Sequence, residues 1–241
     1  MALLELEHVS KRFGRGSSER IALHDVSFEL AEGELVGVWG RRRSGRSTLL
    51  RVVAGIERPD EGIVRIEGRG LADSRPDALR AEVRFCRRTF RAAEGNTVLE
   101  QLMTGQLTRG VSLDRARRQA RHALHRLDAV HSASMRPGDM DGAEATRVAI
   151  ARAIVREPKL LVIDEPTLGL DLTVRDEILA LLRCLSSEGI AVLYSVTDTS
   201  GLAGADRALS LAKGSLNGEL STPGLAPVVP LRRAAAGSAG A

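Results

Sequence analysis

Two short stretches hold the residues best suited to chemistry: residues 40–48, which read GRRRSGRST, and the adjacent acids Asp164 and Glu165. The first stretch is a glycine-bounded turn between two apolar segments, residues 34–39 and 49–54. A strand–turn–helix unit of this kind binds phosphate, because its backbone N–H groups curl around the anion and the helix N-terminus adds a positive dipole end. The predicted phosphate-binding residues are Gly40, Arg41, Ser44, Gly45, Arg46, Ser47 and Thr48.

The loop departs from the usual pattern G-x-x-x-x-G-K-[ST], because Arg46 stands at the lysine position. Arginine carries a planar fork that is larger than the compact ammonium group of lysine. Two interpretations stay open. Lysine is rare throughout the chain (Lys11, Lys159 and Lys213 only), so the exchange can be drift that keeps phosphate binding. Alternatively, the altered geometry weakens the site.

The paired acids follow residues 160–163, a continuous apolar run that suits a central strand of a parallel sheet. Near a bound nucleoside triphosphate, Asp164 would join the Mg²⁺ shell and Glu165 would polarise the attacking water. Two acids can also simply end a strand, but the upstream phosphate loop favours the catalytic interpretation. We therefore predict Ser47 and Asp164 as Mg²⁺ ligands and Glu165 as the general base.

The composition indicates one domain whose core is aliphatic, since 43% of the 241 residues are hydrophobic and only 2% are aromatic. A net charge of +4 does not indicate a nucleic-acid partner, because the basic residues are scattered and lack interleaved aromatic rings. No signal peptide and no run of about 18 apolar residues is present. Cys86 and Cys184 have no metal-ligand spacing, so we expect buried thiols in a reducing cytosol.

Hydrophobic periodicity predicts an antiparallel β portion, a helical stretch and then further strands and helices. The expected strands are residues 3–9, 22–30, 34–39, 63–67, 82–86, 160–163, 190–195 and 207–212. The signal is helical over residues 97–131, and helices are expected at residues 142–155 and 173–187, the first of which begins at a capping box formed by Asp141 and Glu144. Residues from 219 onward are rich in Pro, Ala, Gly and Arg, so we predict a disordered tail.

The motifs together resemble the ATP-binding-cassette (ABC) ATPase family. Residues 147–171, RVAIARAIVREPKLLVIDEPTLGLD, are similar to the family's signature helix, Walker B strand and D-loop, the last with Asp171. Residues 11–14, KRFG, resemble its A-loop, with Phe13 as the adenine-stacking residue, and residues 55–68 also match. The resemblance covers about residues 3–215.

This resemblance implies an α/β fold of the P-loop NTPase, ABC-ATPase type. It comprises a RecA-like core, an antiparallel β portion and a helical subdomain at about residues 89–155. The nucleotide-binding domain would span residues 1–218, followed by the tail at 219–241. Within the family, the chain is most similar to the lipoprotein-release and cell-division type.

The signature motif departs from the family pattern. Where the family has LSGGQ, this chain has Met140, Asp141, Gly142, Ala143 and Glu144. In the family, this helix N-terminus clamps the γ-phosphate bound to the other subunit, but here the Asp141 carboxylate would occupy it. Two like charges about 4 Å apart cost about 4 kcal/mol at an effective dielectric near 20. Ala143 adds a methyl group where the backbone should approach the phosphate.

Two further positions of the family pattern are also altered. The Q-loop glutamine aligns with Arg88, which would repel Mg²⁺ and could pair with Asp164 or Glu165. The switch histidine aligns with Thr197, which cannot carry the imidazole charge to the phosphate. The loss of one transition-state donor typically costs about 10²–10³ in rate. We therefore expect nucleotide hydrolysis to be reduced by several orders of magnitude.

The resemblance implies an ATP-binding subunit that uses ATP and Mg²⁺ and docks on a transmembrane permease through the region after Arg88. It implies a homodimer, or a heterodimer with another cassette, at the cytoplasmic face of the cell membrane, and no nucleic-acid partner. Our first hypothesis is a degenerate subunit with weak nucleotide binding and little hydrolysis. The alternatives are an active ATPase that uses Arg46 in place of lysine, and a scaffold that binds no nucleotide.

Overall fold

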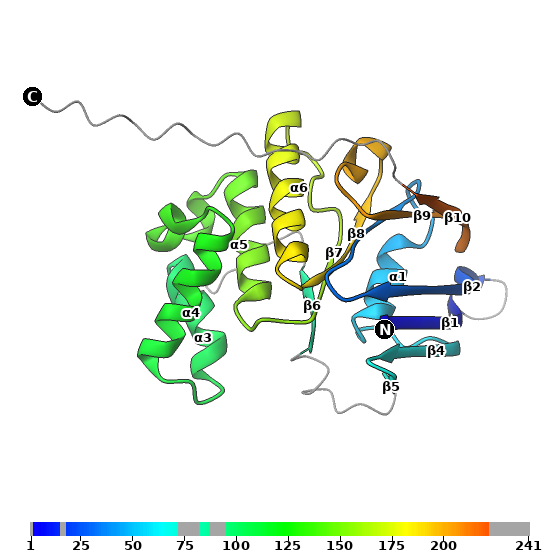
Figure 1. The fold of residues 1–241 in the computed structure, drawn as a ribbon, viewed down its shortest axis with the longest axis horizontal. Coiled ribbons are helices and arrows are strands. Elements are labelled where there is room, and N and C mark those ends of the chain that lie inside the picture. The colour runs from blue at the N-terminus through cyan, green and yellow to red at the C-terminus, as the bar shows by residue number, and fades with distance from the viewer. Residues whose placement is uncertain (1, 15–17, 72–81, 87–94, 222–241) are drawn as a thin grey trace, which may run out of the picture.

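The computed structural model describes residues 2–14, 18–71, 82–86 and 95–221, whose strands form two sheets (Figure 1). The central sheet has six strands, in the order β10 (Ser215–Ser221), β9 (Arg207–Ala212), β3 (Leu35–Trp39), β8 (Ala191–Val196), β7 (Leu160–Ile163) and β6 (Val83–Cys86). All neighbouring pairs are parallel except β10 with β9. The apolar sequences of β3, β7 and β8 are therefore explained by burial on both faces.

The second sheet is antiparallel and confirms the predicted β portion. Its order is β2 (Arg20–Ala31), β1 (Ala2–Phe13), β4 (Glu61–Ile66) and β5 (Arg69–Gly70). Helix α1 (Arg46–Val53) contributes Leu49, Leu50, Val52 and Val53 to the core that this sheet shares with one face of the central sheet. The start of α1 is thereby held at the end of β3.

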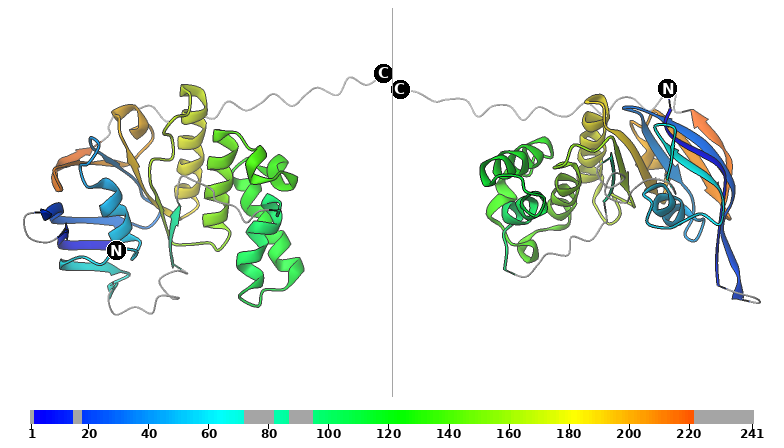
Figure 2. Two further views of the ribbon diagram at one scale, coloured as in Figure 1. Left: turned by 180° about the vertical axis from the view of Figure 1, so that it is seen from behind. Right: turned by 90° about the horizontal axis from the view of Figure 1, so that it is seen from below.

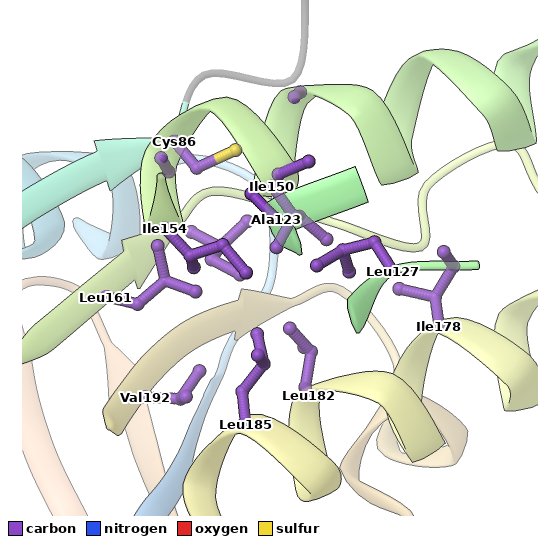
Figure 3. Close-up of a cluster of buried hydrophobic side chains, with 14 of the residues drawn as sticks. Cys86, Ala123, Leu127, Ile150, Ile154, Leu161, Ile178, Leu182, Leu185 and Val192 are labelled. Carbon is purple, nitrogen blue, oxygen red and sulfur yellow. The ribbon is translucent and has the colours of Figure 1, made fainter. Parts of the chain in front are cut away.

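Helices α5 (Gly142–Ile154) and α6 (Leu172–Ser187) pack on the other face of the central sheet. The strand alternation decides which side chains meet them: Leu160 and Val162 of β7 point to the α1 side, whereas Leu161 and Ile163 point to the α5 and α6 side. Figure 3 shows this second core, where Ile150 and Ile154 of α5 lie above Leu182 and Leu185 of α6 in the view.

A helical part lies beyond α5, at the end of the molecule opposite the antiparallel sheet (Figure 2). It contains α3 (Val98–Leu107), α4 (Leu113–Arg126) and the 3₁₀ helices η2 (Val130–Ser134) and η3 (Pro137–Asp139). The predicted helical signal over residues 97–131 is confirmed, and the stretch is divided because Gly110 has a positive φ of 80° and Ser112 caps a new helix. The predicted start of the subdomain, residue 89, lies outside the described residues.

Three further features differ from the prediction or fall beyond it. Strand β10 was not predicted, and it extends to Ser221, into the segment from residue 219 that was expected to be disordered. Residues 222–241 lie outside the described residues.

Cys86 is buried as predicted, but Cys184 is exposed on α6 because it points away from the core that Leu182 and Leu185 enter. In the described ranges, no helix is both long and apolar enough to span a bilayer.

The two thiols should therefore differ in reactivity. Burial raises the pKa of Cys86 to about 12, so this thiol stays protonated and unreactive near neutral pH, whereas Cys184 is accessible. We expect a thiol reagent such as a maleimide to modify the native chain once, at Cys184, and to modify both positions after unfolding. Native Cys184→Ser protein should react at least about tenfold more slowly than the parent. Equal rates at Cys86 and Cys184 in the native chain would contradict this assignment.

Candidate functional site

The phosphate loop connects β3 to α1, and its two glycines are required by close backbone contacts. A Cβ atom at Gly40 would lie 2.3 Å from the carbonyl oxygen of Leu211, and one at Gly45 would lie 2.3 Å from that of Ala22. Gly45 also has a φ of 109°, which L side chains rarely adopt. The loop is anchored further by the N–H of Gly214, which donates to the Ser44 carbonyl at 2.8 Å. The loop conformation is thus fixed by its neighbours.

The N-terminus of α1 is arranged to receive an anion. Gly45 caps the helix without a side-chain hydrogen bond, and the first turn has no acidic residue. Arg43 and Gly45 both have positive φ, which is the kind of turn that directs successive N–H groups into one concavity. The Ser44 hydroxyl is buried and has no hydrogen-bond partner among the described residues. These donors fit a phosphate group, as the sequence predicted.

Arg46, the first residue of α1, extends to the second predicted stretch. Its Nη2 donates to Glu165 Oε1 at 2.9 Å, and only 6% of the arginine side chain and 24% of the glutamate side chain are exposed. Its other terminal nitrogen, Nη1, is buried without a hydrogen-bond partner within the described ranges. The predicted general base is therefore paired with the residue that replaces the loop lysine.

Ser195 organises the two acids, and our sequence analysis did not single it out. Its hydroxyl donates to Asp164 Oδ1 at 2.7 Å and accepts the Glu165 N–H at 3.0 Å. The parallel register of β7 and β8 pairs Ile163 with Tyr194, so the residues that follow are neighbours. The sequence signal was a serine in the largely apolar strand AVLYSV, because a completely buried serine needs a partner.

The predicted Mg²⁺ ligands, Ser47 and Asp164, are half-buried near the loop. Both supply oxygen atoms, the ligand type that Mg²⁺ prefers, and Ser195 fixes the orientation of the Asp164 carboxylate. Among the described residues no cluster of three or more His, Cys, Asp or Glu side chains surrounds a possible metal. A Mg²⁺ ion here would therefore need phosphate oxygens and water to complete its coordination.

The other loop residues take different positions. Thr48 is half-buried in the first turn of α1, whereas Arg41, like its two arginine neighbours, is exposed and has no ion-pair partner in the described part of the chain. Arg41 is therefore on the surface of the loop and free of the contacts that hold Arg46.

The signature segment forms the predicted capping box at the start of α5. The Asp141 carboxylate accepts the Glu144 N–H at 2.7 Å, and the Glu144 carboxylate accepts the Asp141 N–H at 3.0 Å. Glu144 also lies 3.2 Å from His131 Nε2. Gly142 and Ala143 are the first two residues of the helix. Side-chain carboxylates therefore already occupy the positive end of α5, in contrast to the uncapped end of α1.

Phe13 lies at the end of β1 and is 39% exposed, so its ring is available for stacking. Lys11 Nζ lies 5.5 Å from the ring centroid and 2.9 Å from Asp60 Oδ1. The N–H of Arg12 and the side chain of Lys11 donate to Asp60 and lower the pKa of its carboxyl group. These contacts hold the strand end that carries the predicted adenine-stacking residue.

The remaining predicted residues fall at three places. Thr197 directly follows β8 and is half-buried. Asp171 caps α6, because its carboxylate accepts the Val174 N–H at 2.9 Å. Arg88 lies outside the described residues.

A parallel sheet with a phosphate loop after one strand and paired acids after another defines a P-loop nucleotide-binding domain. A family model described as "ABC transporter" matches residues 23–168, and the chain belongs to this family. The chain is 35% identical to the lipoprotein-releasing system ATP-binding protein LolD of Gluconobacter oxydans, over 88% of this chain and 94% of that protein. It is 32% identical to the macrolide export ATP-binding/permease protein MacB 1/2 of Paracoccus denitrificans, over 89% of this chain but only 33% of that protein.

Solved structures agree with this assignment. The dimeric, post-hydrolysis ATP-binding cassette MJ0796 bound to ADP and Pi has a TM-score of 0.83 and 27% identity, over 92% of this chain and 99% of that chain. A second dimeric structure of MJ0796 gives the same TM-score with 28% identity and the same coverage. The predicted ABC-ATPase fold is thereby confirmed.

The Ser195 contacts can be tested by stability measurements. In Ser195→Ala, Asp164 loses a donor and the Glu165 N–H loses its acceptor, and an unsatisfied buried polar group costs about 1–3 kcal/mol. We expect urea denaturation to give a free energy of unfolding that is lower by about this amount. The matched control is Ser187→Ala, which removes an exposed hydroxyl and should change stability by no more than about 0.5 kcal/mol. Equal effects of the two substitutions would contradict the role given to Ser195.

Proposed function

We propose that the chain is the ATP-binding subunit of an ABC transporter of the LolD type, and that it binds nucleotide weakly and hydrolyses it little. Family membership supports the transporter role, and the phosphate loop with its uncapped α1 supports nucleotide binding. The observation that carries the proposed loss of hydrolysis is the 2.9 Å ion pair between Arg46 and Glu165. A general base contributes about 10²–10⁴ in rate, and a carboxylate held by a guanidinium is withheld from water.

The capping box adds a second argument for weak hydrolysis. In this family, each site of a cassette dimer combines the phosphate loop of one subunit with the signature helix of the other. Here the signature helix is capped by Asp141 and Glu144, so its N-terminus offers less positive potential to a phosphate. Thr197 replaces the switch histidine, which removes another donor. These losses do not simply multiply, since groups that act as a unit are not additive.

The chain contributes altered residues to both halves of a dimeric site, so we propose a structural or regulatory role beside a permease. The partner cassette would be a second copy of this chain or a different, competent one. The relatives support this assignment, because LolD is named as part of a lipoprotein-releasing system and MacB as an export ATP-binding/permease protein. The working place would be the cytoplasmic face of the membrane, reached through the permease.

An active ATPase is the second candidate function. The observation that favours it is the retained pair of acids, with Asp164 oriented by Ser195 as an Mg²⁺ ligand would need to be. In this alternative, nucleotide binding draws Arg46 onto the phosphates and releases Glu165 as the base. Turnover that depends on Mg²⁺ and disappears in Glu165→Gln would support it.

Nucleotide binding can be tested by thermal denaturation with and without Mg-ATP. At 100 times the dissociation constant, a ligand stabilises the folded chain by about 2.7 kcal/mol, which raises the melting temperature. We expect the shift to disappear in Arg46→Ala, which loses the buried guanidinium, and to persist in Arg42→Ala, whose arginine is exposed in the same loop. No shift in the parent at millimolar ATP, or at millimolar ADP, would instead favour the nucleotide-free scaffold.

The proposed loss of hydrolysis can be tested by restoring the family residues. We expect the parent to show turnover near background. A variant with Arg46→Lys, Asp141→Ser, Ala143→Gly and Thr197→His should hydrolyse ATP at least about 10²-fold faster, since each change returns a donor or removes a competing charge. Adding Glu165→Gln to that variant should return its ATP hydrolysis to background. Efficient Mg²⁺-dependent turnover by the parent would contradict the proposal and support the active ATPase.

A further inference from the structure

The two ends of the Arg46 guanidinium have different surroundings. Nη2 donates to Glu165 Oε1 at 2.9 Å, whereas Nη1 is buried and finds no acceptor among the described residues. A guanidinium fork can hold two acceptors side by side, one on each nitrogen. Buried donors are almost always paired in native proteins, so Nη1 is a donor that a bound acceptor can use. The Ser44 hydroxyl of the same loop is also buried and has no partner among the described residues.

An acceptor that fits these donors has the properties of a single phosphate. Arg46 Nη1, the Ser44 hydroxyl and the uncapped N–H groups of α1 are all donors, and no acidic residue lies in the first turn of the helix. A phosphate group is an anion with several acceptor oxygens, which suits such a set of donors.

The carboxylate of Glu165 already accepts from Nη2, the other terminal nitrogen of Arg46. In a P-loop, the lysine reaches the β- and γ-phosphates, and the base beside it polarises the water that attacks the γ-phosphate. The space between these two groups is therefore where a terminal phosphate must fit. Here Arg46 and Glu165 are in direct contact across it. A third phosphate would have to take Nη2 from Glu165 and would then face an unpaired carboxylate.

A hydrogen bond to Ser195 holds the backbone of Glu165 in position. Its N–H donates to the Ser195 hydroxyl at 3.0 Å, and Ser195 is fully buried in β8 and bonded to Asp164. Its backbone has a φ of 52°, which is uncommon for a residue other than glycine, so the conformation is specific to this turn. Arg46 is fixed at the opposite side, because it starts α1. The backbones of both partners are thus attached to packed elements.

We propose that Glu165 acts as a built-in substitute for the terminal phosphate, so that the loop of this chain selects a nucleoside diphosphate over a nucleoside triphosphate. The inference rests on the proposed function, since it requires the loop to bind nucleotide. One half of the Arg46 fork stays on Glu165, and the other half receives the single phosphate at the end of the diphosphate. The cassette would then rest with a diphosphate bound, and its occupancy would respond to the ratio of diphosphate to triphosphate.

The test compares ADP and ATP, each with Mg²⁺, by isothermal titration of the full chain. We expect ADP to bind the parent at least about tenfold more tightly than ATP. In Glu165→Gln, the side chain keeps its size but loses its charge, so ATP should bind more tightly and the ratio should fall to about threefold or less. ADP binding should change little. Glu165→Ala should lower the ratio in the same way if Glu165→Gln does not fold.

A matched control uses a second buried arginine and its carboxylate partner. Arg147 Nη2 donates to Glu177 at 2.5 Å between α5 and α6, away from the loop. Glu177→Gln should leave the ratio of ADP to ATP affinity unchanged. Melting curves without nucleotide establish that each variant is folded.

The possible outcomes distinguish a failure of the ADP selectivity from a failure of nucleotide binding. Parent protein that binds ATP as tightly as ADP, with no change in Glu165→Gln, overturns the selectivity and leaves nucleotide binding standing. Absence of binding for both nucleotides overturns nucleotide binding itself, and the selectivity with it. A tenfold preference that collapses in Glu165→Gln but not in Glu177→Gln supports the inference.

Discussion

The parallel hydrogen bonding of β3, β8 and β7 is the constraint on which the site depends. Parallel strands end at the same edge of a sheet, so the loop after β3, the acids after β7 and Thr197 after β8 are brought to one side of the molecule. The core beneath them is continuous and aliphatic, which leaves the strand ends little freedom to shift. The chemistry of the chain is therefore decided by which side chains follow these three strands.

The ion pair of Arg46 and Glu165 is a consequence of that geometry. Both groups lose much of their hydration, and the attraction between them offsets that cost only because the contact is direct. Removing one partner of a buried pair typically costs about 3–5 kcal/mol, so such a pair tends to persist until another charge replaces one member. A phosphate that took Arg46 from Glu165 would have to offset this cost. The phosphate loop and Glu165, the predicted general base, are thus coupled in one contact.

The family's dimeric site uses two helix N-termini, and in this chain side chains cap only one of them. The end of α1 has no side-chain cap, whereas Asp141 and Glu144 cap α5 reciprocally. A helix end can interact favourably with a phosphate or with its own carboxylates, but a carboxylate already in place opposes a second anion. The helix end beside the phosphate loop is therefore open to an anion, whereas the helix end of the signature segment already holds two carboxylates.

Much of the fold and part of the site could be predicted from the sequence alone. The phosphate loop, its two glycines, the apolar strand before the acids and the capping box are local patterns, in which residues within about five positions decide the backbone conformation. Local pattern failed for the break at Gly110 and for β10, because a helix can restart after a glycine and an edge strand depends on the partner that pairs with it.

Only the tertiary structure decided which charges and hydroxyl groups meet. Arg46 and Glu165 are 119 positions apart, and Ser195 is 30 positions beyond Glu165. Their contacts follow from the register between strands and from the direction of each side chain, which no local pattern specifies. The same reason explains why Cys184 is exposed although its neighbours in α6 are buried. The sequence determined that a phosphate loop is present, and the packing of the strands determined that Glu165 contacts its Arg46.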